Sequence, residues 1–312
     1  MNRHSLSVII PVYNSEATLR HLHSRLTAVL EGITPVHEIL FVDDGGPDNS
    51  WNVIEELAQS DTHVTGIKMS RNFGQHNALL CGIRHAANDI IITLDDDLQN
   101  PPEEIPKLLE RLDEGFDVVY GTPVAEKHGI VRNLLSQVTK IVLQKAMGAQ
   151  TARMVSAFRV FRTSLRSAFE RYDGAFVSID VLLTWGTSRF SALPVHHEAR
   201  HAGRSNYTVR KLIRHAMNMM TGFSILPLQF ASLVGFFFTL FGIGVFLYVV
   251  IRYLLYGTPV QGFPFLASAI AIFSGAQLFS LGIIGEYLAR MYFRILRKPS
   301  YNIAATIRHQ TL

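Results

Sequence analysis

Three consecutive aspartates, Asp95, Asp96 and Asp97, follow the apolar run at residues 90–94. Such a run is typical of a parallel strand buried on both faces, and ligands of open α/β sheets collect beyond the carboxyl ends of such strands. Adjacent carboxylates repel one another unless a cation or hydrogen-bond donors compensate. The run therefore predicts a divalent metal held against a phosphate. The alternative is an acidic turn that only caps a helix starting near Pro101.

Polar groups also follow two other apolar runs. The run at residues 6–10 leads into Pro11 and Tyr13, and the run at residues 38–42 leads into Asp43 and Asp44. Because the carboxyl ends of parallel strands meet at one edge of a sheet, we expect these groups to share a rim with the three aspartates. Asp43 could accept hydrogen bonds from a ribose or base, while a metal on the aspartates could neutralise a diphosphate.

The elements that must position these residues alternate along the first half of the chain. Strand patterns occur at residues 6–10, 38–42, 64–69, 90–94 and 118–120. Helix patterns lie between them, at about 15–30, 49–59, 75–87 and 103–114. This alternation predicts an α/β fold with a mostly parallel sheet flanked by helices. The less regular region that follows has a strand pattern at 156–161 and helix patterns at 132–147 and 176–185.

Two long segments carry no Asp, Glu, Lys or Arg, at residues 216–251 and 253–285, and 48% of the 312 residues are hydrophobic. A bilayer core needs about 20 apolar residues per helix. The segments therefore predict transmembrane helices at about 228–253 and 263–287, as a hairpin. A helical hairpin buried in a soluble core is the alternative.

Basic residues flank the outer ends of this hairpin, which by the positive-inside rule predicts a cytosolic N-terminal domain and two cytosolic termini. We divide the chain into a catalytic domain at 1–206, interfacial amphipathic helices at 207–226, the hairpin at 227–289 and a basic cytosolic tail at 290–312. A core-facing helix is the alternative for the interfacial segment. The basic clusters, in a chain of net charge +4, indicate a membrane surface and no nucleic-acid partner.

Several motifs together resemble one known family. They lie at residues 11–14 (Pro-Val-Tyr-Asn), 42–45 (Val-Asp-Asp-Gly), 70–76 (Ser-Arg-Asn-Phe-Gly-Gln-His), 94–103 (Leu-Asp-Asp-Asp-Leu-Gln-Asn-Pro-Pro-Glu), 158–162, 200–207 and 282–290. On them the chain resembles the inverting nucleotide-sugar glycosyltransferases of family 2, which have the GT-A fold. Within that family it is similar to the polyprenyl-phosphate glycosyltransferases, which include dolichyl-phosphate mannose synthase and bacterial undecaprenyl-phosphate sugar transferases.

The resemblance implies roles on the donor side of the reaction. Pro11, Tyr13, Asp43 and Asp44 would hold the nucleotide, together with Asp95 and Arg204. Asp95, Asp97 and Gln99 would bind Mg²⁺ or Mn²⁺ beside the diphosphate, with Asp96 as a bystander.

On the acceptor side, Arg132 and Ser136 match positions that the family uses to grip the lipid phosphate, and their i, i+4 spacing puts them on one helix face. A solvated helix face is the alternative. Arg200 and Arg204 would lie in a loop that closes over the nucleotide, where Arg can pair bidentately with phosphate. A basic loop facing the membrane is the alternative. The expected catalytic residues are therefore Asp95, Asp97, Arg132, Ser136 and Arg200.

An anionic lipid phosphate can attack the anomeric carbon without a dedicated base, so Asp180 is expected to be structural. The expected function is sugar transfer from a nucleoside-diphosphate sugar to polyprenyl phosphate, by a multi-pass protein of the bacterial inner membrane. The family also suggests a homotetramer. Transfer to diacylglycerol or a polysaccharide, or a non-catalytic membrane scaffold, are the alternatives.

Overall fold

The computed structural model describes residues 4–123, 154–174, 177–198, 226–257, 262–296 and 299–309. The chain divides into two compact units. One comprises Met1–Ile213 together with Lys298–Leu312, and the other comprises Arg214–Arg297.

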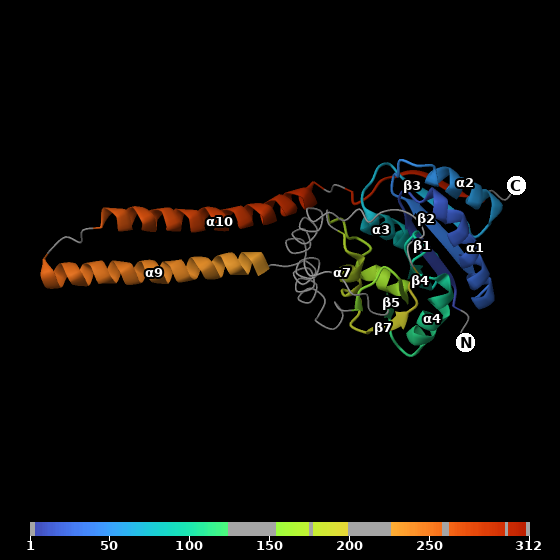
Figure 1. Cartoon of the computed structure of the whole chain (residues 1–312), viewed down its shortest axis with the longest axis horizontal. Coiled ribbons are helices and arrows are strands. Elements are labelled where there is room, and N and C mark those ends of the chain that lie inside the picture. Colours follow the sequence, from blue (N-terminus) through green and yellow to red (C-terminus); the bar gives the residue numbers. More distant parts are fainter. Residues whose placement is uncertain are drawn as a thin grey trace. The chain divides into compact units, whose positions relative to one another are not determined.

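The first unit contains an eight-stranded sheet with the order β7-β5-β6-β4-β1-β2-β3-β8 (Figure 1). Its strands are β1 (Leu6–Val12), β2 (His37–Asp43), β3 (Val64–Met69), β4 (Ile90–Thr93), β5 (Val118–Pro123), β6 (Arg159–Arg162), β7 (Phe190–Val195) and β8 (Ile303–Arg308). Strands β4, β1, β2 and β3 pair in parallel. Strand β6 is antiparallel to both β4 and β5, and β8 is antiparallel to β3. The mostly parallel α/β sheet confirms the expected fold class.

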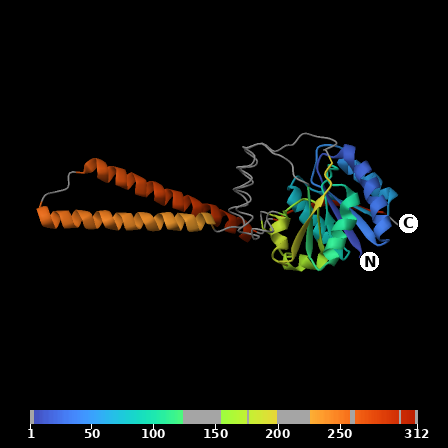
Figure 2. The ribbon, with the colours of Figure 1, turned by 60° about the horizontal axis from the view of Figure 1, so that its bottom comes forward.

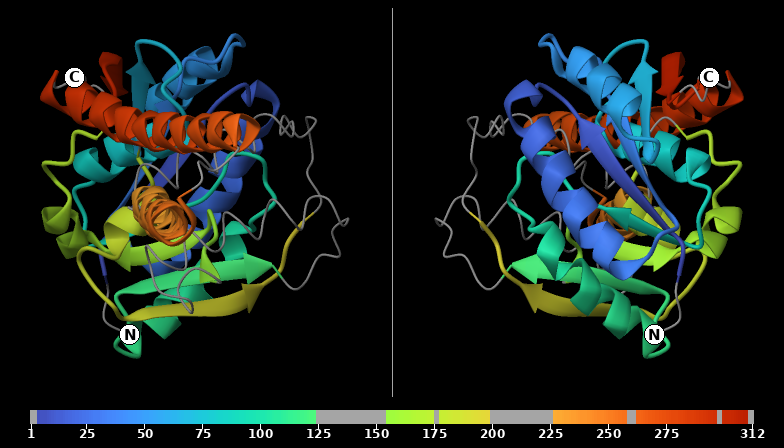
Figure 3. Two further views of the ribbon diagram at one scale, coloured as in Figure 1. Left: turned by 90° about the vertical axis from the view of Figure 1, so that its left-hand side faces the viewer. Right: turned by 90° about the vertical axis from the view of Figure 1, so that its right-hand side faces the viewer.

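Helices cover both faces of this sheet. They are α1 (Glu16–Ile33), α2 (Ser50–Ser60), α3 (Gln75–His85), η1 (Pro102–Glu104), α4 (Ile105–Asp113), η2 (Thr163–Ala168) and α7 (Ile179–Leu183). Because side chains alternate along a strand, β1 sends Leu6, Val8 and Ile10 into a core with α1, α2 and α4. Ile9 points into a second core, formed with α3, η2 and α7. In the right-hand view of Figure 3, the blue helices α1 and α2 lie in front of the sheet.

The second unit contains two long helices, α9 (Leu226–Tyr256) and α10 (Phe263–Ile295). They lie side by side as an antiparallel pair (Figure 2), and Phe273 packs edge-on against Phe238 with 5.4 Å between ring centroids. Both contain segments long and apolar enough to cross a membrane, Pro227–Tyr256 and Ile272–Ala289. Ala231 is the one buried residue among those described in these two segments, which argues against a hairpin inside a soluble core.

The structure differs from the sequence-based expectation most clearly at the C-terminal end. Instead of a basic tail over residues 290–312, helix α10 continues to Ile295 and β8 (Ile303–Arg308) forms an edge strand of the sheet. The reason is that β3 would otherwise expose the N–H and C=O groups of its outer edge, which β8 pairs. Strand β7 (Phe190–Val195) was also not predicted. The expected helix at 132–147 and the interfacial segment at 207–226 lie outside the described residues, apart from Leu226, which begins α9.

Candidate active site

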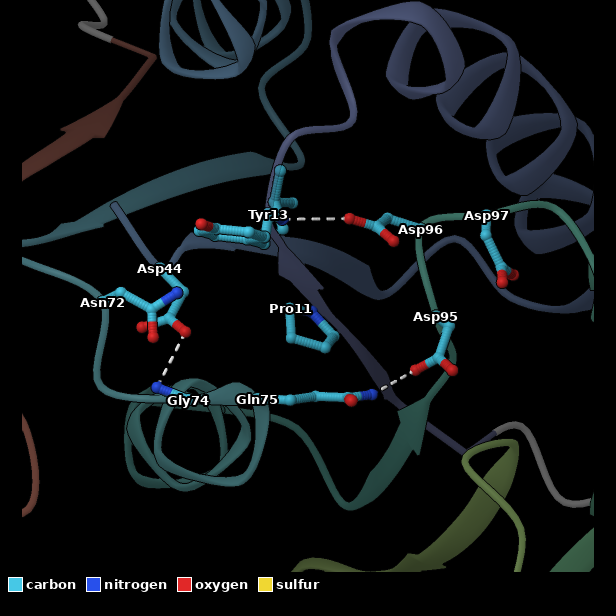
Figure 4. A pocket seen from close by; sticks show the side chains of 10 residues that line it. Pro11, Tyr13, Asp44, Asn72, Gly74, Gln75, Asp95, Asp96 and Asp97 are labelled. Carbon is cyan, nitrogen blue, oxygen red and sulfur yellow. Dashed lines mark hydrogen bonds between the residues drawn. The ribbon is translucent and has the colours of Figure 1, made fainter. Parts of the chain in front are cut away.

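A pocket lies beyond the carboxyl ends of β1, β2 and β4, next to the first residues of α3 (Figure 4). Its lining residues lie at the end of a strand or in the segment that follows one, for each of four strands: Pro11, Val12, Tyr13, Asp44, Asn72, Gly74, Gln75, Asp95, Asp96 and Asp97. In Figure 4, Asp44 and Asn72 lie on one side of the pocket and the three aspartates on the other. The expected meeting of Pro11, Tyr13 and the aspartates at one rim is therefore confirmed.

Asp44 organises the loop between β3 and α3. Its carboxylate accepts hydrogen bonds from the backbone N–H groups of Phe73 at 2.7 Å and Gly74 at 2.8 Å. Burial raises the pKa of Asp44 to about 6, although both N–H donors act in the opposite direction. Gly45 follows with φ +68°, and a Cβ atom there would lie 2.8 Å from the carbonyl carbon of Arg71. Only glycine allows this close backbone approach, which positions Asn72 at the pocket.

Asp96 holds the turn between β1 and α1. Its carboxylate accepts hydrogen bonds from the backbone N–H of Tyr13 at 3.1 Å and from the hydroxyl of Ser15. Burial raises the pKa of Asp96 to about 6. Between these two residues Asn14 has φ +59°, a conformation that Asn tolerates better than most side chains. The residue expected to be a bystander therefore has a structural role at the pocket.

Asp95 and Asp97 are the two expected metal ligands that line the pocket. The side-chain amide of Gln75 donates to Asp95 at 2.6 Å, and Asp97 accepts the backbone N–H of Gln99 at 3.1 Å. No group of three His, Cys, Asp or Glu side chains could hold a metal ion within the described ranges. Two carboxylates nevertheless fit Mg²⁺, which proteins bind through one or two carboxylates together with substrate phosphates and water. Gln99 does not line the pocket, unlike the two aspartates.

Asp43 is buried at the end of β2, with 2% of its surface exposed, and it is not among the pocket-lining residues. Its carboxylate accepts the backbone N–H of Gly46 at 3.4 Å, and burial raises its pKa. Neighbouring residues at a strand end point in opposite directions, so Asp44 and Asp43 cannot face the pocket equally. The nucleoside contact of Asp43 stays a prediction.

The remaining expected site residues, Arg132, Ser136, Arg200 and Arg204, lie outside the described residues. Asp180 has the structural role that we expected. It accepts hydrogen bonds from buried Arg159 at 2.6 Å and from the Tyr120 hydroxyl at 3.1 Å. An aspartate paired in this way in the interior is not available as a general base.

Asn72 and Gln75 line the pocket, although we assigned them no role from the sequence. Both belong to the motif at residues 70–76, which follows β3. The rule that ligands collect beyond strand ends applies to β3 as it does to β1, β2 and β4. That rule was therefore a signal that could have identified them.

The chain is similar to several known proteins. Residues 7–172, more than half of the chain, match the family described as Glycosyl transferase family 2. Over 301 residues the chain is 36% identical to the undecaprenyl-phosphate 4-deoxy-4-formamido-L-arabinose transferase of Shewanella sediminis, covering 96% of this chain and 91% of that protein. Among solved structures, glucosyl-3-phosphoglycerate synthase from Mycobacterium tuberculosis matches 70% of this chain and 78% of its own, at 18% identity and a TM-score of 0.49.

The family match over residues 7–172, which include most of the sheet and its acidic pocket, identifies the chain as a glycosyltransferase. More specifically, the chain belongs to glycosyl transferase family 2.

Proposed function

We propose that this protein transfers a sugar from a nucleoside-diphosphate sugar to undecaprenyl phosphate or a similar polyprenyl phosphate. The observation that carries the proposal is the 36% identity to an undecaprenyl-phosphate sugar transferase, which extends over 96% of the chain and so includes both long apolar helices. A membrane-embedded acceptor fits a chain with two such helices. Membrane association is common to the proposal and its diacylglycerol alternative, whereas the chemistry of the acceptor distinguishes them.

The pocket supports binding of the donor. Tyr13, whose surface is 46% exposed, offers a ring face against which a base could stack. Asp44 and Asp96 hold the two loops that frame the donor, while Asp95 and Asp97 would hold Mg²⁺ or Mn²⁺. When bound, the cation would neutralise charge on the departing diphosphate.

In the proposed reaction, an oxygen of the lipid phosphate forms a bond to the anomeric carbon of the sugar. The bond from that carbon to the diphosphate oxygen breaks, and the nucleoside diphosphate leaves with the electron pair. Attack opposite to the leaving group inverts the anomeric configuration. Because the acceptor oxygen is already ionised, no residue has to remove a proton. Arg132 and Ser136 are proposed to hold the acceptor phosphate, and Arg200 and Arg204 the donor phosphates.

We further propose that the protein lies in the inner membrane of a bacterium. Its first unit, which we call the catalytic unit, and both of its termini would face the cytosol. We also propose that the protein is a homotetramer. Glycines in both long helices, such as Gly235, Gly244 and Gly282, would permit close helix contacts between subunits. Native mass spectrometry in detergent tests the oligomeric state.

The function is tested by incubating the purified protein with undecaprenyl phosphate, Mg²⁺ or Mn²⁺ and a panel of labelled nucleotide sugars. The expected result is one lipid product whose mass equals undecaprenyl phosphate plus the sugar residue. Parallel reactions replace the acceptor with diacylglycerol or a polysaccharide. Product only in those reactions would overturn the polyprenyl-phosphate acceptor, and no product with any acceptor would support the scaffold alternative.

A further inference from the structure

Arg25, in the middle of α1, forms a double ion pair. Its guanidinium donates to Glu103 through Nε at 2.9 Å and Nη2 at 2.7 Å. It also donates to Glu198 through Nη1 at 3.1 Å and Nη2 at 2.8 Å. Four of its five N–H groups are thus used, and only 18% of the side chain is exposed. The Glu103 side chain is 51% exposed and that of Glu198 26% exposed. Two bidentate pairs on one largely buried guanidinium form a better-defined contact than an isolated exposed ion pair.

The two carboxylates belong to segments that meet beside residues 95–99, which we call the acidic loop. Glu103 lies in η1, which follows the loop in sequence. Glu198 lies just beyond β7, and its backbone N–H donates to the carbonyl oxygen of Gln99 at 2.9 Å. Arg25 therefore joins α1 to both segments that border residues 97–99. It does so from outside the pocket, since it is not one of the lining residues.

The acidic loop has an unfavourable backbone conformation that requires outside support. Leu98 has φ +63°, a left-handed conformation that is rare for a residue with a bulky side chain. Such conformations persist when the surrounding structure holds them in place. In this loop the support comes from burial of Leu98, which is 2% exposed, and from the hydrogen bonds on either side of it. The bond from Glu198 to Gln99 is one of these, and Arg25 fixes Glu198.

We propose that Arg25 is a positioning residue for the loop at residues 97–99, and through it for Asp97 at the donor diphosphate. The assignment of Asp97 to the diphosphate rests on the proposed function. The placement of the loop by Arg25 does not, because it depends only on the contacts of Arg25, Glu103, Glu198 and Gln99.

The same helix offers a matched control. Arg20 pairs with Glu56, but these side chains are 57% and 62% exposed. Removing Arg20 deletes an arginine and an ion pair from α1 without touching the acidic loop. Comparison of Arg25→Met with Arg20→Met therefore separates the effect of losing the contact beside the acidic loop from the effect of losing a positive charge on α1.

The first measurement is hydrogen exchange of the full-length protein without ligand. In Arg25→Met we expect the amides of Glu198 and of residues 97–99 to exchange about tenfold faster, while β1 and β2 keep wild-type protection. Arg25→Lys retains the charge but loses the planar fork of the guanidinium. Its exchange rates at these amides should lie between those of wild type and Arg25→Met. Exchange at Glu198 equal to that in Arg20→Met would overturn the positioning role, whether or not the protein transfers sugar.

The second measurement is steady-state kinetics with the donor, acceptor and Mg²⁺ varied in turn. Arg25→Met should lower kcat/KM for the donor by roughly ten- to hundredfold and raise the Mg²⁺ concentration for half-maximal rate, with the acceptor KM unchanged. A lower melting temperature with wild-type kinetics would show that Arg25 is only structural. If Arg25→Met does not fold, Glu198→Gln, which breaks one of the two pairs, is measured in the same way. Absence of any transfer by the wild-type protein would refute the proposed function and leave the exchange result to decide the role of Arg25.

Discussion

Replacing Gly45 with alanine tests whether the backbone contact between the segments after β2 and β3 shapes the pocket. Gly45 has φ +68°, and a Cβ atom would lie 2.8 Å from the carbonyl carbon of Arg71 and 2.9 Å from the backbone nitrogen of Asn72. Backbone atoms cannot rotate away as a flexible side chain can, so the segment carrying Asn72 must shift. Gly115 is the matched control, because it also has a positive φ of +104° but nothing lies within 4 Å of its Cβ position.

Both variants place a Cβ in a left-handed conformation, which costs roughly 1–2 kcal/mol. Both also regain roughly 0.4–1 kcal/mol because alanine restricts the unfolded chain. Only Gly45→Ala adds steric overlap, at roughly 1–3 kcal/mol. We therefore expect Gly45→Ala to lower the free energy of unfolding by about 2–4 kcal/mol, and Gly115→Ala by about 1 kcal/mol.

Thermal unfolding in detergent, followed by tryptophan fluorescence, measures this difference. The two tryptophans, Trp51 and Trp185, both lie in the catalytic unit, so the signal reports on that unit and not on α9 or α10. At about 2–4 °C per kcal/mol, Gly45→Ala should melt about 4–16 °C below wild type. Its donor KM should also rise, roughly tenfold, because Asn72 moves at the pocket. Equal melting temperatures and equal donor KM for the two variants would refute the reasoning.

Three further predictions concern charged residues. Asp97→Ala should lower metal-dependent transfer at least about hundredfold while the protein stays folded in detergent, and wild-type turnover would exclude Asp97 as a metal ligand. Arg132→Ala should raise KM for the lipid acceptor more than for the donor, and an effect on the donor alone would assign Arg132 to the nucleotide. Burial raises the pKa of Asp44 from 3.8 to about 6, so its protonated form favours the fold. Its contribution is therefore present below about pH 4 and is lost, by about 3 kcal/mol in all, as the pH rises through 6. The melting temperature of Asp44→Asn should fall less over this pH range than that of wild type, while Asp96, whose pKa is also about 6, still titrates. Parallel pH profiles for variant and wild type would contradict the assignment.

Local patterns in the sequence were sufficient for the centre of the fold. Strands β1 and β4 are mostly continuous apolar runs, and helices such as α1 repeat their apolar residues with helical spacing. The local sequence is therefore enough to predict each of these elements. The edge strands of the sheet were harder to predict from the sequence. Strand β7 contains Pro194 and buries only Ser191 and Val195, and β8 exposes most of its side chains. These two strands exist because they pair with β5 and β3, which a local pattern does not reveal.

The site divides in the same way. The sequence alone determined that acidic and polar residues follow several buried parallel strands, and strand ends of one sheet share an edge, so the pocket of Tyr13, Asp44, Asp95 and Asp97 was predictable. Only the tertiary structure decided that Asp44 and Asp96 hold loops as well as lining the pocket, and that Asp43 is not among the lining residues. Asp96 bonds to a turn more than 80 positions earlier in the chain, and Arg25 joins Glu198 across 173 positions. Spacing in the sequence carries no trace of such partners, because they meet only after the strands pair and the helices pack on the sheet.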